Sequence, residues 1–550
     1  MVFSFLTAFV KAIYNVNKRI LERSRRMEHF KKHPLYRFRW LIFVLPYFLA
    51  LAGYIQLYFI EDHFNDVNTK YLVLAAFYNS FKIYGMSVSA DLNQMNMWFE
   101  VARLGGGLVT TSVIVKVAKF IMEKLRTWRM VRKPDTLVVH GDGALQKTLL
   151  QTLGTNSIAA NGEMCFQAKQ HVLAFDQDAQ ALRYIMKHEK DFLSTDKITY
   201  FLSTGYEASD YGENGVIVSN IAANCARLYW AEHWLKDPNI RRVAIIGFGH
   251  YGERLLEQAL LVNVLPWRDS IEYHIFGSDG KNYLSWHPQL INCLSINQSD
   301  ETKDSVHFHP LVPEDIRLLQ QMNRIIIATD DVDENLLLLD RLLHTGMNGI
   351  IHVRCGEDLL THLQYIPRRQ YTNPHLQIKA FGSNEQLFSQ DVILHGQLLQ
   401  SAKENHRMYV AQSQAENIYR KYFSCQNYAN CLHQGYCGQC LHAAATWDDL
   451  TPFEKASNIA AADHAPIKQT LLKVADQHSS IKDCKDSLCR TEHIRWCRFY
   501  YLHNWAYAET RDDHRRFHPL LQPFDQLSPS EQDKDWWPYE LLLQQPYDEK

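Results

Sequence analysis

Gly247, Gly249 and Gly252 have the spacing of a turn that binds phosphate groups. The apolar run 243–247 precedes them and a run with helical periodicity follows, which predicts a strand, a turn and a helix. Gly247 permits the tight turn, Gly249 lets backbone approach a pyrophosphate, and Gly252 lets the helix pack closely on the strand. Free N–H groups at the start of such a helix attract an anion. The pattern predicts a dinucleotide-binding fold of the Rossmann type.

The expected ligand of this turn is NAD or another adenine nucleotide. The fingerprint includes an acidic residue about 20 residues after the glycines, at the tip of the second strand. Asp279 comes later than that and follows Gly277 and Ser278, so it is either a ribose ligand or a solvated loop residue. The residues expected to contact the ligand are Gly247, Gly249, His250, Tyr251, Gly252, Asp279 and Asp330.

Four of the 11 cysteines lie close together and are separated by five, five and two residues: Cys425, Cys431, Cys437 and Cys440. The last two form a Cys-x-x-Cys pair, which is a usual half of a tetrahedral zinc site. The spacing of the first two is irregular. A structural zinc site is therefore one interpretation, and buried or redox-active thiols are the other.

Two polar clusters near the C-terminus form a second candidate ligand site. The first cluster lies on one predicted helix and comprises Ser457, Asn458, Asp463, His464 and Lys468. Glu492, Arg495 and Trp496 fall on neighbouring turns of a later helix. If these two faces meet, they make either a pocket for a charged small molecule, with an aromatic wall, or a seam of salt bridges that holds the domain together.

The elements around the glycine turn predict an α/β fold. Four further apolar runs alternate with helical stretches, at 271–276, 305–310, 324–331 and 350–355, which predicts a doubly wound sheet over 240–395.

Residues 134–236 read as a degenerate copy of that fold, with Gly141 and Gly143 but Gln146 in place of the third glycine. Gln146 is expected to push the helix off the strand, which puts nucleotide binding there in doubt. Residues 171–178 predict a second strand, which ends at Asp176, and residues 197–203 predict another. Residues 216–235 predict a helix that bridges to the second fold.

The N-terminal part predicts a membrane hairpin over 39–126. Residues 41–60 carry no charge across 20 positions, and 104–121 form a second, weaker apolar stretch that contains Lys116 and Lys119. Basic residues lie before the first stretch and after the second. The positive-inside rule then predicts a protein of the plasma (inner) membrane with both termini in the cytoplasm.

Residues 71–87 are apolar but too short to cross a bilayer, so they form either a re-entrant segment or part of an ordered outer loop on a plain membrane anchor. Residues 1–38 predict an amphipathic, basic segment that lies on membrane lipid.

Composition limits the remaining choices. A chain of 550 residues that is 46% hydrophobic is long enough for several domains. Its net charge of -2 gives no reason to expect a nucleic-acid partner. Residues 396–444 read as a linker that carries the cysteine cluster, and 445–540 as a mostly α-helical C-terminal domain.

Two family resemblances follow from these motifs. The hairpin, the sequence GFGHYG at 247–252 and TDD at 329–331 resemble regulator-of-potassium-conductance (RCK, TrkA-N-like) domains, with the resemblance covering about 134–395. It implies tandem nucleotide folds that form a ring beneath a two-span, potassium channel-like pore. The loop departs from the potassium filter Thr-Val-Gly-Tyr-Gly, because Lys82-Ile83-Tyr84-Gly85 is its nearest match, so the resemblance does not extend to potassium selectivity.

The stretches 447–468, 491–507 and 514–535 resemble, in this order, the ryanodine-receptor (RyR) repeat domain. This resemblance implies a small helical module that is often fused to other sensor domains.

Together these features predict a ligand-gated membrane ion channel or channel-like effector that senses a nucleotide-like small molecule. Neither nucleotide fold shows a catalytic base, so we do not expect an enzyme. One hairpin cannot enclose a pore, so a homo-oligomer, guessed to be a tetramer, is expected. The alternatives are a membrane-anchored nucleotide sensor or scaffold without a pore, and a membrane-bound NAD-dependent oxidoreductase.

Overall fold

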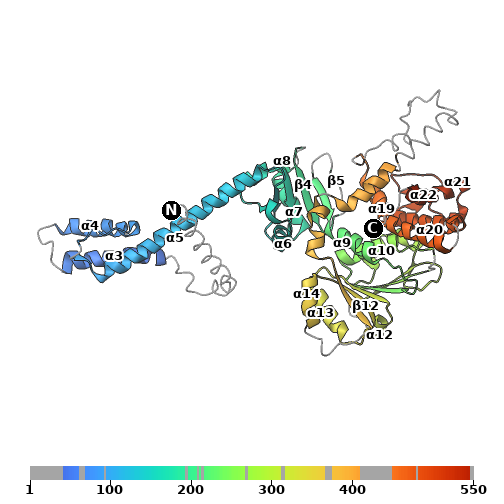
Figure 1. Cartoon of the computed structure of the whole chain (residues 1–550), viewed down its shortest axis with the longest axis horizontal. Coiled ribbons are helices and arrows are strands. Elements are labelled where there is room, and N and C mark those ends of the chain that lie inside the picture. The colour runs from blue at the N-terminus through green and yellow to red at the C-terminus, as the bar shows by residue number, and fades with distance from the viewer. Residues whose placement is uncertain are drawn as a thin grey trace, which may run out of the picture. The chain divides into compact units, whose positions relative to one another are not determined.

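The computed structural model divides the chain into two compact units, Met1–Arg129 and Met130–Lys550 (Figure 1). It describes residues 41–60, 68–91, 94–192, 196–206, 210–211, 216–266, 270–310, 316–365, 375–394, 396–408, 410, 447, 449–478 and 481–544. The predicted amphipathic segment 1–38 and the predicted zinc ligands Cys425, Cys431, Cys437 and Cys440 lie outside these residues.

The described residues of the first unit form three α-helices and two short helical turns. In chain order these are α3 (Leu41–Ile55), η2 (Gln56–Ile60), α4 (Thr69–Phe81), η3 (Lys82–Gly85) and α5 (Met97–Val131). Among the described residues, α5 is the one helix long and apolar enough to cross a membrane, and Phe43–Phe59 is a shorter apolar helix. The two-span hairpin therefore stays a prediction.

Small residues bring the helices of this unit into close contact. A Cβ atom on Gly106 would lie 2.4 Å from the carbonyl oxygen of Ile83, and one on Gly53 would lie 2.9 Å from the ring of Phe99. Glycine is thus required where α5 meets the η3 turn and where α3 meets α5. Residues 105–107 are helical and packed.

The second unit begins with a six-stranded sheet in the order β2-β1-β3-β4-β6-β5, parallel except for the edge strand β5. Its strands are β1 (Leu137–His140), β2 (Ser157–Ala159), β3 (Gln170–Leu173), β4 (Ile198–Ser203), β5 (Asp210–Tyr211) and β6 (Val216–Asn220). Its helices are α6 (Ala144–Thr152), η5 (Gly154–Asn156), η6 (Glu163–Gln167), α7 (Asp178–Lys187), α8 (Glu189–Phe192) and α9 (Ile221–His233).

The single helix predicted over 216–235 is wrong in its first part. Val216, Ile217 and Val218 belong to β6, which pairs with β4. These β-branched side chains favour a strand. Asn220 then ends the strand and caps α9, because its side chain accepts a hydrogen bond from the backbone N–H of Ala223 at 2.8 Å.

A seven-stranded, fully parallel sheet follows, in the order β13-β12-β11-β7-β8-β10-β9. Its strands are β7 (Arg242–Ile246), β8 (Glu272–Phe276), β9 (Ser295–Ile296), β10 (Ser305–His309), β11 (Arg324–Ile327), β12 (Gly349–Arg354) and β13 (Leu376–Phe381). Its helices are α10 (His250–Val262), α11 (Lys281–Trp286), η8 (Pro288–Asn292), α12 (Ile316–Gln320), α13 (Val332–Leu343), α14 (Glu357–Tyr365), α15 (Asn384–Leu387) and α16 (Gln390–Ile393). The strand order reverses at β7, which is where nucleotides bind in such sheets. The predicted α/β class with parallel sheets is confirmed.

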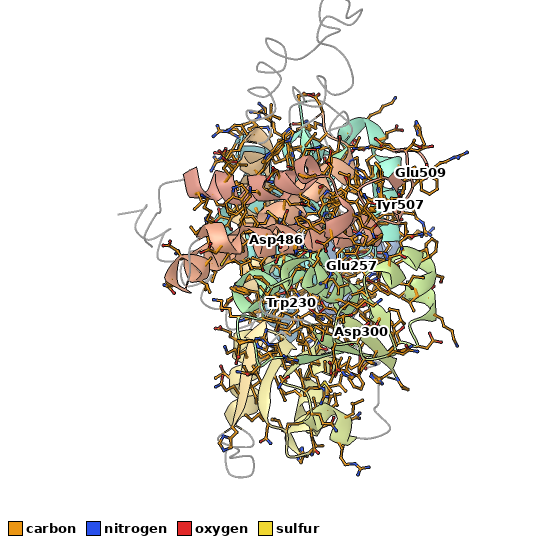
Figure 2. The ribbon with its side chains drawn as sticks, turned by 90° about the vertical axis from the view of Figure 1, so that its right-hand side faces the viewer. Trp230, Glu257, Asp300, Asp486, Tyr507 and Glu509 are labelled. Carbon is orange, nitrogen blue, oxygen red and sulfur yellow. The ribbon has the colours of Figure 1, made fainter. Side chains whose placement is uncertain are left out.

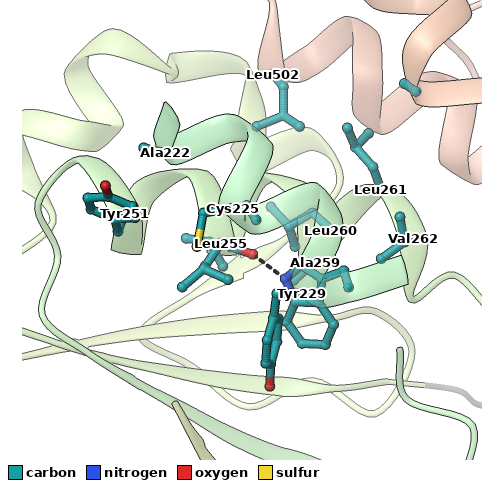
Figure 3. Close-up of a cluster of buried hydrophobic side chains, with 14 of the residues drawn as sticks. Ala222, Cys225, Tyr229, Tyr251, Leu255, Ala259, Leu260, Leu261, Val262 and Leu502 are labelled. Carbon is teal, nitrogen blue, oxygen red and sulfur yellow. Dashed lines mark hydrogen bonds between the residues drawn. The ribbon is translucent and has the colours of Figure 1, made fainter. Parts of the chain in front are cut away.

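The C-terminal part is mostly helical and shares its apolar core with the second sheet. It comprises α19 (Pro452–His478), α20 (Ile481–Leu502), β14 (Ala506–Tyr507), β15 (Phe517–His518), η10 (Phe524–Gln526), α21 (Pro529–Gln532), η11 (Asp533–Trp536) and α22 (Trp537–Gln544). Figure 3 shows part of the shared core, in which Cys225 and Tyr229 of α9 lie beside Leu255 and Leu260 of α10, with Leu502 of α20 close by.

Candidate nucleotide site and the helix that carries it

In the turn between β7 and α10, Gly247 and Gly252 are required because a Cβ atom at either position would collide with backbone atoms. Gly247 has a φ of +94°, and a Cβ atom there would lie 2.6 Å from the backbone of Thr329. A Cβ atom on Gly252 would lie 1.9 Å from the carbonyl oxygen of Gly247. The turn and the close helix–strand contact expected from the sequence are therefore both present.

The carboxylate of Asp330 lies on the N-terminus of α10. It accepts hydrogen bonds from the backbone N–H groups of His250 and Tyr251, both at 3.3 Å. A Cβ atom on Gly249 would lie 2.4 Å from an Asp330 carboxylate oxygen, so glycine is required here for the aspartate to approach. In this structure the position that an anionic ligand would take is filled by an anion of the chain itself.

Arg354 places a buried positive charge beside the same turn. Its guanidinium carbon lies 4.0 Å from the ring centroid of Tyr251, and Nε and Nη2 donate to the carbonyl oxygen of Thr329 at 3.2 and 2.9 Å. The side chain is 5% exposed. Burial raises the pKa of Tyr251 to about 12, so the phenol stays protonated. Arg354 was missed by the sequence analysis, although a charged residue that ends an apolar strand is a usable signal.

Asp279 is an exposed residue with contacts inside its own loop. Its carboxylate accepts a hydrogen bond from the backbone N–H of Lys281 at 3.1 Å and lies 3.2 Å from the Lys281 ammonium. The hydrogen bonds from Lys281 lower the pKa of Asp279. The loop thus satisfies this carboxylate, and a contact with a ribose stays a prediction.

The first sheet carries a matching arrangement. Asp176 accepts hydrogen bonds from the backbone N–H groups of Ala144 and Leu145, at the start of α6, at 3.2 and 3.1 Å. Gln146 was expected to force helix and strand apart. Instead, its side-chain amide donates to the carbonyl oxygen of Val139 in β1 at 3.0 Å, so the larger residue is held against the strand by a hydrogen bond.

The helix that carries the candidate site contacts three other helices. The indole N–H of Trp230 in α9 donates to the carbonyl oxygen of Leu255 at 2.8 Å. Arg498 of α20 donates to the carbonyl oxygen of Leu260 at 3.1 Å. Figure 2 shows Trp230 and Glu257, from α9 and α10, among the packed side chains next to the C-terminal helices.

Asp463, expected to bind a ligand, lies instead at a junction of α9, α10 and α19. Its two carboxylate oxygens accept hydrogen bonds from Nε and Nη2 of Arg227, both at 2.8 Å, and Gln258 of α10 donates to it at 2.9 Å. Arg227 was not singled out from the sequence. This bidentate pair fixes the C-terminal helices against the nucleotide folds.

Glu492 is the centre of a buried charge cluster between α19 and α20. It lies 2.7 and 3.0 Å from two guanidinium nitrogens of Arg495 and 2.8 Å from the ammonium of Lys468. Burial raises the pKa of Glu492, but Arg495 and Lys468 together hold it well below its usual range. Burial lowers the pKa of Lys468 to about 8. Three expected ligand residues are thus paired with one another.

The remaining residues of that expected site lie in different surroundings. His464 is buried near Glu492, at 3.9 Å, and burial lowers its pKa to about 3. Asn458 and Ser457 are partly exposed, and the Asn458 amide donates to the carbonyl oxygen of Glu454 at 2.9 Å. Trp496 is partly exposed, with its ring 4.2 Å from that of Tyr500. The structure therefore joins four of the eight residues, and ligand binding by this domain stays a prediction.

Comparisons with known proteins cover the chain unevenly. No curated protein matches it. One similar solved structure is the crystal structure of a mutant of GsuK, at 13% sequence identity, a TM-score of 0.29, and coverage of 64% of this chain and 96% of that chain. The family model of the RyR domain matches residues 466–545. The C-terminal helical part of this chain is thus similar to the RyR domain, as its sequence motifs predicted.

Proposed function

We propose that the chain is a ligand-controlled membrane channel or channel-like effector, and that an adenine nucleotide controls it at the N-terminus of α10. One observation carries the proposal. The helix whose N-terminus holds the Asp330 carboxylate is also the helix that contacts α9, α19 and α20. A change at the N-terminus of α10 therefore reaches both nucleotide folds and the RyR-like domain through direct contacts.

A nucleotide phosphate competes with Asp330 for the same N–H groups. Two anions at one helix N-terminus repel each other, so a bound phosphate displaces the carboxylate. Arg354, buried beside Tyr251, offsets the added negative charge. Asp330 is joined directly to Asp331, whose side chain caps α13 by accepting from the N–H of Asp333 at 2.8 Å. Displacement of Asp330 therefore disturbs the start of a second helix.

The path toward the membrane runs through the first sheet. Val131, the last residue of α5, is buried against Val138 of β1 and Ile158 of β2. Thr136 donates its hydroxyl hydrogen to the carbonyl oxygen of Met130 at 2.7 Å. A rearrangement of this sheet therefore moves the end of the long apolar helix. A nucleotide that prefers one state by 100-fold contributes about 2.7 kcal/mol per subunit to the shift.

The test uses the full chain in liposomes. ATP, ADP, AMP and NAD are added singly while ion flux is followed, and the molecules retained by the purified protein are identified by mass spectrometry. A retained adenine nucleotide and a flux that depends on it support the proposal. Binding without flux favours the anchored sensor, and turnover of a nicotinamide cofactor favours the oxidoreductase. If no nucleotide binds, the proposed control site is wrong.

A further inference from the structure

The η3 turn, Lys82–Gly85, lies beside the middle of the apolar helix α3. Ile83 is 1% exposed and packs against Ala50 and Ala102. Ala50 is the tenth residue of the uncharged stretch 41–60, so it lies at its midpoint. The close contact between Gly106 and the carbonyl group of Ile83 fixes the turn against α5 at the same level. If these helices span a bilayer, the turn lies deep inside it.

The segment that follows this turn has no regular secondary structure and is largely exposed. Residues 87–89 are in neither helix nor strand, and Gly85, Met86, Ser87 and Ser89 are exposed in a single copy. The hydroxyl of Tyr54 accepts the N–H of Ser89 at 2.8 Å, which holds the segment against α3. Irregular backbone at this depth is tolerated only where protein or a water-filled cavity covers it, because lipid offers it no hydrogen bonds. The exposed face of this segment must therefore meet further copies of this chain or water.

The charge on this segment is positive. The ammonium of Lys82 lies 2.8 Å from the hydroxyl of Ser89 and 5.2 Å from the ring centroid of Tyr78. Within the described part of the first unit, Glu100 forms an ion pair with Arg103 and Glu123 forms one with Lys119, and no carboxylate pairs with Lys82. Lys116, on α5, lies over the ring of Phe43 at 5.3 Å. Symmetric copies would repeat each of these ammonium groups around a common axis.

We propose that several copies of this chain enclose a water-filled path lined by residues 85–89, and that Lys82 makes this path selective for small monovalent anions such as chloride. The proposal rests on the proposed channel function and adds the permeant class to it. A ring of ammonium groups at a narrow point attracts anions and repels cations, as Lys and Arg rings do in anion pores. At an effective dielectric constant near 20, an anion about 6 Å from an ammonium group is favoured by a factor of about 100.

Water access is tested without any need for a ligand. Ser87→Cys, on the exposed segment, is treated in intact liposomes with an anionic and a cationic thiol reagent that do not cross membranes. Labelling at position 87 is measured by mass spectrometry. Leu104→Cys, on an exposed apolar position of α5, is the control. Labelling at 87 but not at 104, at least several-fold faster with the anionic reagent, supports the proposal. No labelling at 87, or faster labelling by the cationic reagent, overturns it.

Selectivity is then tested by the reversal potential under a potassium chloride gradient. The wild-type reversal potential is expected near the chloride equilibrium potential, and that of Lys82→Glu is expected to move toward the potassium value. Lys70→Glu, the same charge change at the exposed start of α4, should leave it unchanged. A wild-type potential near the potassium value overturns the inference while leaving the channel function intact. Anion-preferring labelling at 87 without any nucleotide-dependent current contradicts the proposed function instead.

Discussion

Asp176 and Asp330 occupy equivalent positions in the two sheets. Asp176 follows β3, which lies beside β1, and Asp330 follows β11, which lies beside β7. Asp176 accepts hydrogen bonds from the first two backbone N–H groups of α6, and Asp330 does the same at α10. The repeat explains why Gly143 and Gly249 are both glycine, since a Cβ atom on either would collide with the carboxylate. Both folds thus hold an internal anion at the place where nucleotide folds hold phosphate.

Asp330→Asn is expected to raise the affinity for an adenine nucleotide. The amide keeps the size of the side chain but removes the negative charge that competes with phosphate at α10. We expect the dissociation constant to fall about fivefold to tenfold, which corresponds to about 1 kcal/mol of relieved repulsion. Isothermal titration calorimetry on the full chain in detergent measures it.

Asp279→Asn is the matched control for this measurement, because Asp279 is exposed and is paired within its own loop. It should leave the dissociation constant within twofold of the wild type. An Asp330→Asn protein that binds nucleotide more weakly than the wild type would show that Asp330 contacts the ligand favourably, as expected when it was placed among the predicted ligand contacts.

Gly252→Ala is expected to lower the thermal stability of the second nucleotide fold strongly. The added methyl group would lie 1.9 Å from the carbonyl oxygen of Gly247, which forces helix and strand apart. A loss of about 2–4 kcal/mol follows from such overpacking against backbone. Differential scanning fluorimetry compares this variant with Gly205→Ala, whose methyl group would first meet side-chain atoms at 3.3 Å. Equal melting temperatures for the two variants would contradict the geometry of the turn.

Arg498→Met is expected to loosen the RyR-like domain from the second sheet. Arg498 lies 2.9 Å from Asp304, and both side chains are almost fully buried. Removing one partner leaves a buried charge unpaired, at a cost of about 3–5 kcal/mol. Limited proteolysis should then cleave the variant faster between the second sheet and α19. The double variant with Asp304→Asn should recover part of the loss, and if it recovers none, the two residues do not act as a pair.

His352→Phe is expected to stabilise the protein, and more so at acidic pH. His352 is 1% exposed, and neither ring nitrogen has a hydrogen-bond partner among the described residues. Burial, with smaller contributions from Arg324 and His233, lowers the pKa of His352 to about 2. The pKa of this histidine in the unfolded chain is about 6.5. Below that pH the unfolded chain binds a proton at His352 and the folded chain does not, so the folded state loses stability as the pH falls.

The expected gain from His352→Phe is about 1 kcal/mol at pH 7 and about 2 kcal/mol more at pH 5. Melting temperatures measured from pH 7.5 to pH 5 should diverge from those of the wild type as the pH falls. The exposed residue His514, changed to Phe in the same way, should give parallel curves. Parallel curves for the His352 variant would show that this histidine takes up a proton in the folded state.

The sequence predicted the central strands because a strand buried on both faces needs an unbroken apolar run. For this reason 243–247 cover all of β7 except its first residue, Arg242, and 324–331 contain β11. The same rule misled for 216–235, since a run that is apolar on all sides fits a buried strand as well as a helix. The short edge strands β2 and β9 were not predicted, because two or three residues carry no measurable periodicity.

The candidate sites were less predictable because they depend on distant pairs. The His250 amide and Asp330 are 80 positions apart, and Arg227 and Asp463 are 236 apart. Helix periodicity correctly placed Glu492 and Arg495 on one face. It could not show whether that face binds a ligand or forms a salt bridge with Lys468. The answer depends on how α19 packs on α20, which is set by contacts with α10 that lie far away in the sequence.

The match to the RyR domain begins at residue 466, whereas α19 begins at Pro452 and continues through Pro466 without a break. The upstream half of this helix supplies Phe453, whose ring centroid lies 5.2 Å from those of both Phe499 and Trp505. A fragment cut at the family boundary would lack this aromatic layer. Transplantation of the module into another protein should therefore begin upstream of Thr451, whose N–H and hydroxyl groups bond Glu454 and secure the first turn of the helix.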